Sequence, residues 1–243
     1  MKRIFTDLHL RVNPTNQQAT QQIVNKAKEL GYHKLSIPLT AQQQDQAYKL
    51  KATCTQAGID FVLRSDFKPR NQEDLTHFLR KNRRKTEITC IVCDNKEIAR
   101  QAAKDRRVDL LNFPSLDYHK RFFDRAEAEL ASNSLAALEI DTKPLLVLEG
   151  PPRVRLLSSL RREVAIAREF HVPIVLSSGI SEQNLMRTPR DLASLAYLFG
   201  MNETEASDAV SANPNAIVTR NREKLSSSFV APGIRTIKEA KTI

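Results

Sequence analysis

Short runs of β-branched and aliphatic residues alternate with longer stretches of helical spacing along the chain. The runs that predict strands are residues 4–12, 34–39, 60–64, 87–93, 108–113, 136–140 and 173–177. Between them apolar residues recur at helical spacing, as in Ile23, Ala27 and Leu30, which is typical of one buried helix face. Such alternation predicts repeated βα units around a parallel sheet.

The fold that this alternation predicts is a TIM-like (β/α) barrel with about seven parallel strands. The chain has 243 residues, which is close to the usual size of such a barrel and near the upper limit for a single core. No Gly/Ser linker or low-complexity tract divides it, so one domain over residues 1–243 is expected. Residues 229–243 carry Pro232 and Gly233, and we expect this tail to be more loosely attached.

Several helix starts are marked by a capping side chain with an acid three residues later. The pairs are Asn71 with Asp74, Asp94 with Glu97, Thr188 with Asp191, and Asn202 with Glu205. Pro189 follows Thr188 at the first helical position, where its missing N–H costs nothing. These signals predict where four of the helices begin.

The charge of the chain indicates an acidic partner. Its 38 Lys and Arg exceed its 28 Asp and Glu, for a formal net charge of +10, which favours nucleic acid or an anionic membrane surface. No apolar run approaches the roughly 18 to 20 residues of a spanning helix, and the start of the chain turns polar too early for a signal peptide. We therefore favour nucleic acid as the partner and an intracellular location.

The cysteines do not predict a disulfide framework or a zinc site. There are three, an odd number, which fits a reducing compartment. Cys90 and Cys93 have CxxC spacing but lie inside an apolar run that reads as a strand. Residues three apart in a strand point to opposite faces, so these thiols would not converge on one ion. We interpret both as core residues.

The alternation of the first strand predicts which of its side chains reach the barrel mouth, where the chemistry of such barrels lies. Asp7, His9 and Arg11 share one face and approach the mouth in that order. Leu8 and Leu10 share the other face, which suits packing under the helices.

A metal site at the mouth is one alternative. The candidate ligands for a hard divalent cation are Asp7, His9, Asp66 and Glu139. Only one histidine lies at the mouth, whereas a hydrolytic binuclear site needs several convergent ligands, and Arg11 and Arg64 would repel a cation. We interpret the mouth as a polar plug. No nucleophile elbow, dinucleotide fingerprint or Walker loop is present.

Particular stretches resemble known families. Phe5-Thr6-Asp7-Leu8-His9-Leu10 is similar to the first motif of the polymerase-and-histidinol-phosphatase (PHP) superfamily, whose metal-binding members carry His-x-His where this chain has Asp7-x-His9. Residues 174–179, 185–201 and 211–214 resemble the family of ribonuclease P protein component 3, the subunit of roughly thirty kilodaltons in archaea and eukaryotes. The resemblance runs from Ile4 to about Asn221.

The resemblance implies a PHP-like barrel that has lost its metal chemistry, with Asp7 and His9 as remnants of the site. It implies a non-catalytic subunit of ribonuclease P, the enzyme whose RNA, with Mg²⁺, removes the 5′ leader of precursor tRNA. The implied partners are that RNA and protein component 2, in a heterotetramer, together with the other holoenzyme subunits. The implied location is the archaeal cytoplasm, and no cofactor is expected on this chain itself.

Two rival functions stay open at this point. One is a PHP-type metal-dependent phosphoesterase that uses Asp7, His9, Asp66 and Glu139. The other is a purely structural adaptor that makes no contact with RNA.

Basic residues are the expected RNA contacts, because Lys and Arg neutralise phosphates. The candidates at the mouth are Arg64, Lys68, Arg70, Arg153, Arg155, Arg187 and Arg190. Arg187 and Arg190 flank a predicted helix N-terminus, where a cation is electrostatically misplaced unless it helps to bind an anion. Further clusters at residues 80–85 and 104–107 precede strands and so lie on the opposite face, where opposing the helix dipole is an alternative role.

Overall fold

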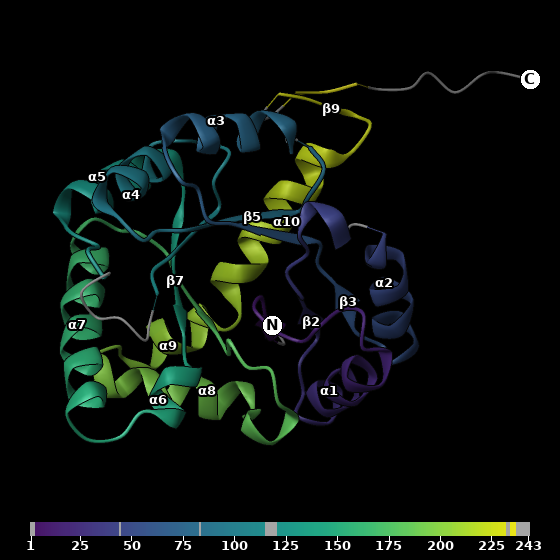
Figure 1. The fold of residues 1–243 in the computed structure, drawn as a ribbon, viewed down its shortest axis with the longest axis horizontal. Helices are drawn as coiled ribbons and strands as arrows, with labels where there is room; N and C mark the ends of the chain where they lie inside the picture. Colours follow the sequence, from purple (N-terminus) through teal and green to yellow (C-terminus); the bar gives the residue numbers. More distant parts are fainter. Residues whose placement is uncertain (1–2, 44, 83, 115–120, 232–233, 237–243) are drawn as a thin grey trace, which may run out of the picture.

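The computed structural model describes residues 3–43, 45–82, 84–114, 121–231 and 234–236. Short parallel strands form a ring with helices packed around its outside, which confirms the predicted TIM-like barrel (Figure 1). The strands of the ring are β1 (Thr6–Asp7), β2 (Lys34–Leu35), β3 (Asp60–Phe61), β4 (Arg64–Phe67), β5 (Ile88–Val92), β6 (Leu110–Asn112), β7 (Ala137–Asp141) and β8 (Ile174–Ser177). The strand expected at residues 60–64 is thus divided between β3 and β4.

The ring consists of two sheets, with strand orders β1-β2-β3 and β4-β5-β6-β7-β8. Backbone hydrogen bonds beyond the regular strands close both seams. At one seam Leu39 N–H donates to the carbonyl of Arg64 at 3.0 Å. At the other, Gly179 N–H donates to His9 at 2.9 Å and Arg11 N–H to Ile180 at 2.7 Å. The closure brings β1 against β8, so residues from the two ends of the barrel sequence meet at one mouth.

The helices of the described residues are α1 (Gln17–Glu29), α2 (Gln46–Gln56), α3 (Gln72–Lys81), α4 (Lys96–Ala103), α5 (Arg125–Ser134), α6 (Lys143–Val147), α7 (Gly150–Glu169), α8 (Pro189–Leu195), α9 (Glu203–Ala209) and α10 (Ala212–Leu225). Short 3₁₀ segments occur at Ala41–Gln43, Gln183–Leu185 and Ala196–Phe199. None of the helices in the described part of the chain is long and apolar enough to cross a membrane.

The helix starts follow the capping signals with one correction. The side chains of Asn71, Thr188 and Asn202 accept the expected backbone N–H at the starts of α3, α8 and α9. At α4, however, the cap is Asn95, whose side chain accepts from the N–H of Ile98, and not Asp94. Asp94 is instead drawn into an ion pair with Lys68 at 3.0 Å.

The interior of the barrel is apolar at the end where the strands begin and polar at the mouth, where the strands end. Leu8, Cys90, Leu110 and Val175 form one buried interior cluster. Leu8 therefore packs inside the ring, contrary to the expected position under the helices, because the backbone leaves regular strand geometry after Asp7. Cys93 packs in the outer core instead, which confirms that Cys90 and Cys93 are core residues on opposite faces.

Helix α10 closes the end of the barrel opposite the mouth. Ile217 and Val218 of α10 belong to the interior cluster. Asn221 Nδ2 donates to the carbonyl of Glu87 and to Asp109 Oδ1, both at 2.7 Å. In Figure 1 the helix runs diagonally across the middle of the ring. The backbone and carboxylate groups at the start of the strands are therefore capped by side chains of one helix.

The segment after α10 turns back along that helix. β9 (Phe229–Ala231) pairs antiparallel with β10 (Ile234–Arg235). Arg235 lies 3.3 Å from Glu223 of α10. Within the tail that we expected to be loosely attached, β9 and β10 are thus paired, and residues 232–233 and 237–243 lie outside the described residues.

Leu135 ends α5 with a φ of +67°, in the left-handed region that disfavours a residue with a Cβ. Its side chain is 60% exposed, so little packing is lost on truncation. We expect Leu135→Gly to raise the free energy of unfolding by about 0.5–1 kcal/mol, through relief of this backbone strain. Urea denaturation of both proteins measures the difference.

The matched control is Val154→Gly on α7, where an exposed side chain is removed from right-handed helical backbone. That change should lower stability, because glycine loses more backbone freedom in a helix. A destabilised Leu135→Gly protein would show that the Leu135 side chain contributes more than its backbone costs.

Candidate functional site at the barrel mouth

The mouth of the barrel is organised around one buried arginine. Arg64, the first residue of β4, has no exposed side-chain surface. Its Nη1 and Nη2 donate to Glu139 Oε1 at 2.6 Å and Oε2 at 2.7 Å. Its Nε and Nη2 donate to Asp66 at 2.5 and 3.1 Å, and Nη1 also donates to the carbonyl of Leu8 at 2.8 Å. All five N–H groups of a guanidinium are thereby used.

Glu139 of β7 is the acidic centre of this network. Besides Arg64, it accepts hydrogen bonds from Ser177 Oγ at 2.7 Å and Asn112 Nδ2 at 2.9 Å. Burial alone would raise the pKa of Glu139, but the Arg64 guanidinium outweighs burial and holds that pKa far below its ordinary value. The carboxylates of Asp66 and Glu139 likewise outweigh the effect of burial on Arg64 and raise its pKa. Both partners are therefore charged in the interior.

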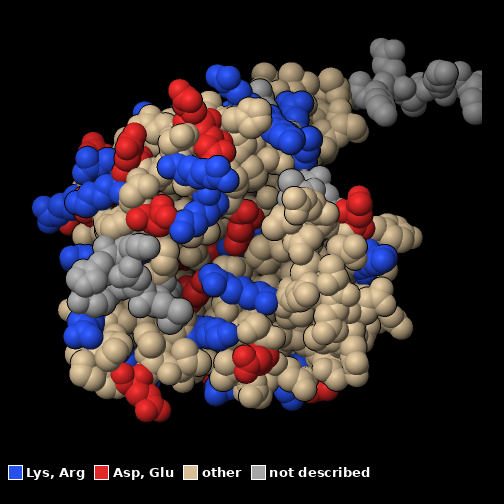
Figure 2. All heavy atoms as spheres, viewed as in Figure 1, with Lys and Arg blue, Asp and Glu red and all other residues tan. Residues whose placement is uncertain are grey.

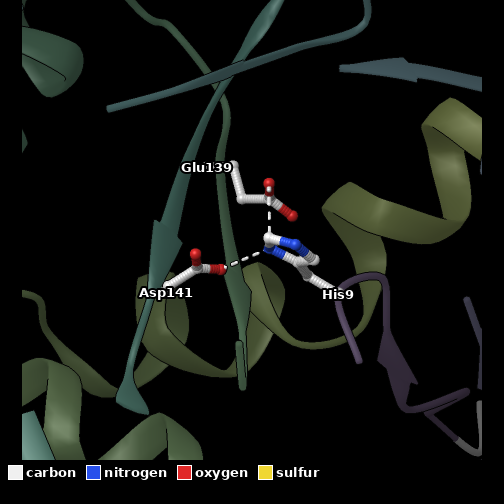
Figure 3. A group of neighbouring side chains, drawn as sticks. All are labelled: His9, Glu139 and Asp141. Atoms are coloured by element: carbon white, nitrogen blue, oxygen red, sulfur yellow. Dashed lines mark hydrogen bonds and ion pairs between the residues drawn. The ribbon is translucent and has the colours of Figure 1, made fainter. Parts of the chain in front are cut away.

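His9 forms a second ionic contact beside the first (Figure 3). Its Nδ1 lies 2.8 Å from Asp141 Oδ1 and 3.8 Å from Glu139 Oε2. Burial disfavours the charged imidazole, yet the Asp141 carboxylate more than compensates, so the pKa of His9 lies above its ordinary value. Arg11 Nη2 donates to the other oxygen of Asp141 at 3.0 Å. Asp141 is thus held between an imidazole and a guanidinium.

The side chain of Asp7 binds backbone groups and is not part of these ion pairs. Its Oδ1 accepts the backbone N–H of His9 and that of Ser178, each at 3.1 Å. Its Oδ2 is buried and has no hydrogen-bond partner among the described residues. Burial raises the pKa of Asp7, which favours the neutral acid. Asp7 therefore ties β1 to the segment after β8.

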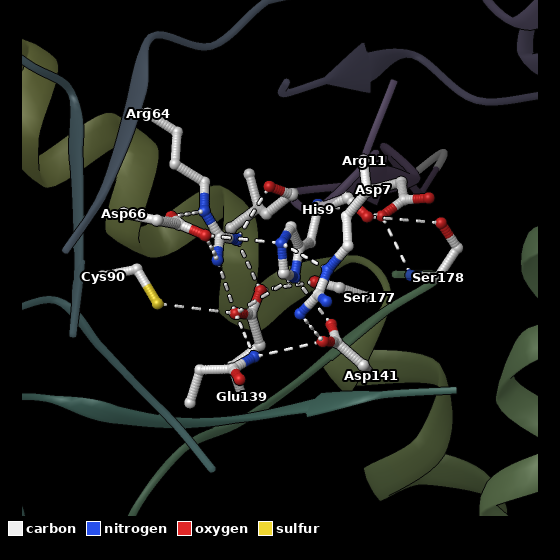
Figure 4. A network of polar contacts seen from close by, with 12 residues as sticks. Asp7, His9, Arg11, Arg64, Asp66, Cys90, Glu139, Asp141, Ser177 and Ser178 are labelled. Atoms are coloured by element: carbon white, nitrogen blue, oxygen red, sulfur yellow. Dashed lines mark hydrogen bonds and ion pairs between the residues drawn. The ribbon is translucent and has the colours of Figure 1, made fainter. Parts of the chain in front are cut away.

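The mouth brings together three groups of metal-ligand type, but their surroundings do not fit a divalent cation. Donor atoms of His9, Glu139 and Asp141 lie within 4.8 Å of one another. In Figure 4 the carboxylates of Glu139 and Asp141 accept hydrogen bonds from Arg64, Arg11 and neutral donors. Two guanidinium groups in contact with these carboxylates neutralise their charge and repel another cation. The described side chains at the mouth therefore do not fit a divalent metal ion.

Of the four ligands considered from the sequence, the structure groups His9, Glu139 and Asp66. Asp66 Oδ2 lies 3.3 Å from His9 Nε2 and its carboxylate is also bonded to Arg64, whereas Asp7 accepts the backbone N–H of His9. The residue that sequence reasoning missed is Asp141, the closest ionic partner of His9. The signal was present in the spacing Glu139-x-Asp141, since residues two apart in a strand share a face.

Arg64 was predicted to bind RNA, but its side chain is buried, so this prediction is wrong. A guanidinium with no exposed surface, saturated by carboxylates, cannot reach a phosphate. Lys68 and Arg70 follow β4 at the mouth and are exposed, but Lys68 is engaged with Asp94. Arg153 and Arg155 lie near the start of α7, the first half-buried and the second exposed.

Arg187 and Arg190 are not at the mouth. Arg190 lines a groove together with Gly31 and His33, which directly precede β2 and so lie toward the opposite end of the barrel. Arg187 donates to the carbonyls of Met186 at 2.9 Å and Asn184 at 3.2 Å. Asp191 already supplies a negative charge in the first turn of α8, so the predicted anion site at this helix start lacks support.

The fold and the mouth define a class: a (β/α) barrel whose mouth carboxylates are paired with its own arginines. The model of the family RNase P subunit p30 matches residues 4–226. The chain belongs to this family.

Similar proteins from archaea support membership of the same family along most of the chain. Ribonuclease P protein component 3 of Methanosarcina barkeri is 28% identical over 239 residues, which cover 97% of this chain and 96% of the relative. The protein of that name from Methanocaldococcus jannaschii is 29% identical over 72% of this chain and 74% of its own length.

Solved structures support the fold. A chain in the cryo-EM structure of archaeal ribonuclease P with mature tRNA matches with a TM-score of 0.83 and 24% identity, over 98% of this chain and all of that one. Ochratoxinase of A. niger matches with a TM-score of 0.61 and 12% identity, over 89% of this chain and 71% of that one. Hydrolases with very different sequences therefore share this barrel.

Removal of Arg64 tests its role at the mouth. We expect Arg64→Met to lower the free energy of unfolding by about 3–5 kcal/mol, because it leaves Glu139 buried without a counter-ion. Urea denaturation measures the loss. Adding Glu139→Gln to this variant should recover part of it, since the uncompensated charge disappears. Arg70→Met, at an exposed position just after β4, is the control; equal stability of the two methionine variants would contradict this role of Arg64.

His9 predicts a pH dependence of stability. Because its pKa is raised in the folded state, its contribution is complete below the ordinary value near 6.5 and is lost as pH rises through the folded-state pKa. We expect the difference in stability between the wild type and His9→Gln to shrink above neutral pH. Thermal melts from pH 5.5 to 8.5 measure it, with His77→Gln on α3 as the exposed control. A pH-independent difference would mean that His9 acts as a neutral packing group.

Proposed function

We propose that this chain is a non-catalytic protein subunit of ribonuclease P, which supports RNA-catalysed removal of the 5′ leader from precursor tRNA. The observation that carries the proposal is family membership over residues 4–226, with relatives named as ribonuclease P protein component 3 along almost the whole chain. The similarity to a chain of an archaeal ribonuclease P with mature tRNA supports it.

The chemistry of the mouth is consistent with this role. Arg64 and Arg11 neutralise the carboxylates that a metal-dependent phosphoesterase would need. The groups at the mouth hold the strand ends together, and the carboxylates and imidazole among the described residues there are engaged in ion pairs. The proposal therefore assigns catalysis to the RNA and its Mg²⁺, and binding to this chain.

The proposed partners are the ribonuclease P RNA and the other protein subunits. Protein component 2 is the proposed direct protein partner, in a heterotetramer with this chain, and the archaeal cytoplasm is the proposed location. The net charge of +10 supports contact with RNA, because cationic side chains release counterions from phosphates on binding.

Reconstitution tests the proposal. Cognate ribonuclease P RNA and the other protein subunits are mixed with and without this chain, and cleavage of precursor tRNA is followed across magnesium concentrations. At low magnesium we expect the chain to raise the rate by about tenfold or more, because added cations offset phosphate repulsion in the RNA.

Metal analysis of the purified chain is run alongside. No gain in cleavage, with the chain folded and the other subunits active, would overturn the proposal. Stoichiometric manganese or zinc, with phosphoesterase activity lost in His9→Ala, would favour the rival enzyme.

A further inference from the structure

Surface cations of this chain differ in whether an acid neutralises them. Many are in ion pairs, such as Arg168 with Glu205 and Arg222 with Asp60. A group at the N-terminal end of the barrel has no ion pair within the described part of the chain: Arg80, Lys81, Arg84, Lys85, Lys104, Arg106 and Lys224. They come from the end of α3, the loop before β6 and the end of α10. Figure 2 shows blue side chains gathered beside β9, at the top of the view.

A cavity of about 410 Å³ opens within this group. Arg84, Arg106 and Lys224 line one part of it. Leu225 at the end of α10 and Phe229 of β9 line another. The lining of the cavity therefore combines positive charge with apolar side chains and the Phe229 ring, and its volume is in the range of pockets for small organic ligands.

The acidic groups nearby do not cancel this charge. Asp109 lines the cavity, but its Oδ1 accepts from Arg220 at 2.9 Å and Asn221 at 2.7 Å, and its Oδ2 from the N–H of Thr89 at 2.9 Å. Asp105 is bonded to Arg107. Burial and the nearby positive charge of Arg220 lower the pKa of Lys224, although Asp109 opposes them. The cavity thus has an excess of positive charge that an anion would relieve.

We propose that this cavity binds one unpaired nucleotide of RNA, with its phosphate against Arg84, Arg106 and Lys224 and its nucleoside against Phe229. Cations beside an aromatic ring are the combination with which proteins hold single-stranded RNA, by phosphate contact and base stacking. An acidic protein segment could also pair with the cations, but such a partner would not account for the Phe229 ring in the lining. The inference rests on the proposed function and places its RNA contact at the end opposite the mouth.

The salt dependence of RNA binding tests the phosphate contacts. The double variant Arg106→Ala/Lys224→Ala is compared with Lys49→Ala/Lys51→Ala on α2, which removes the same charge from exposed positions elsewhere. Binding of cognate ribonuclease P RNA by the complex with the other subunits is measured from low to high salt. We expect the slope of log affinity against log salt to fall in magnitude by about 0.7 for the cavity variant, since one single-strand phosphate contact contributes about 0.7. The control should keep the wild-type slope.

Phe229→Leu tests the stacking separately. Leucine keeps the wall apolar but cannot stack on a base, so affinity for the RNA should fall by about fivefold or more with the salt slope unchanged. Thermal melts establish that each variant retains the fold.

The outcomes separate this inference from the proposed function. If wild-type chain stimulates the reconstituted enzyme while both cavity variants bind RNA like the control, the nucleotide site is wrong and the subunit role stands. If the cavity variants lose binding to the other protein subunits in the absence of RNA, at unchanged salt slope, the cavity is a protein contact instead. Failure of the wild-type chain in reconstitution overturns the proposed function itself.

Discussion

The contacts of Arg64 with Glu139 and Asp66 hold opposite charges together at the buried barrel mouth. They keep Glu139 ionised in a fully buried position. The raised pKa of His9 is due mainly to the nearer Asp141, against the opposing charge of Arg64. Removing water from such groups is costly, and the cost is offset only because every N–H of the guanidinium is used. The guanidinium also bonds the carbonyl of Leu8, just after β1, and so joins this segment to β4 and β7 across the ring. The charged groups at the mouth therefore stabilise the fold.

Most of the barrel could be predicted because its strands are buried on both faces and read as short apolar runs, such as residues 88–92 and 174–177. Three features could not. The strand at residues 60–67 is divided into β3 and β4, of which β3 pairs with β2 and β4 with β5. Leu8 lies inside the barrel, because the alternation of inward and outward side chains does not continue past Asp7. The plugging of the barrel by α10 was also unpredicted, since an amphipathic pattern does not show which surface a helix covers.

The site was harder to predict than the fold, because side-chain partners far apart in sequence decide what a residue does. The sequence around Arg64 does not distinguish it from an exposed arginine. Its burial depends on Glu139, which is distant in the chain. Arg190 follows a strand and was therefore placed at the mouth. The linking segment instead packs along α1, with Met186 in the core beside Ile23, and carries α8 toward the other end. The sequence placed His9, Arg64, Asp66 and Glu139 at the mouth correctly, but not Arg190, and it did not show which groups meet.

The position of α10 also constrains the order in which the molecule can be assembled. Its Arg222 bonds Asp60 across 162 residues, and its Asn221 bonds the Glu87 carbonyl across 134. Such separations slow folding, because a long loop must close before the contact stabilises it. The outer helices can form early, but the interior stays open to water until α10 packs across it. The ring without α10 therefore exposes apolar surface that favours aggregation.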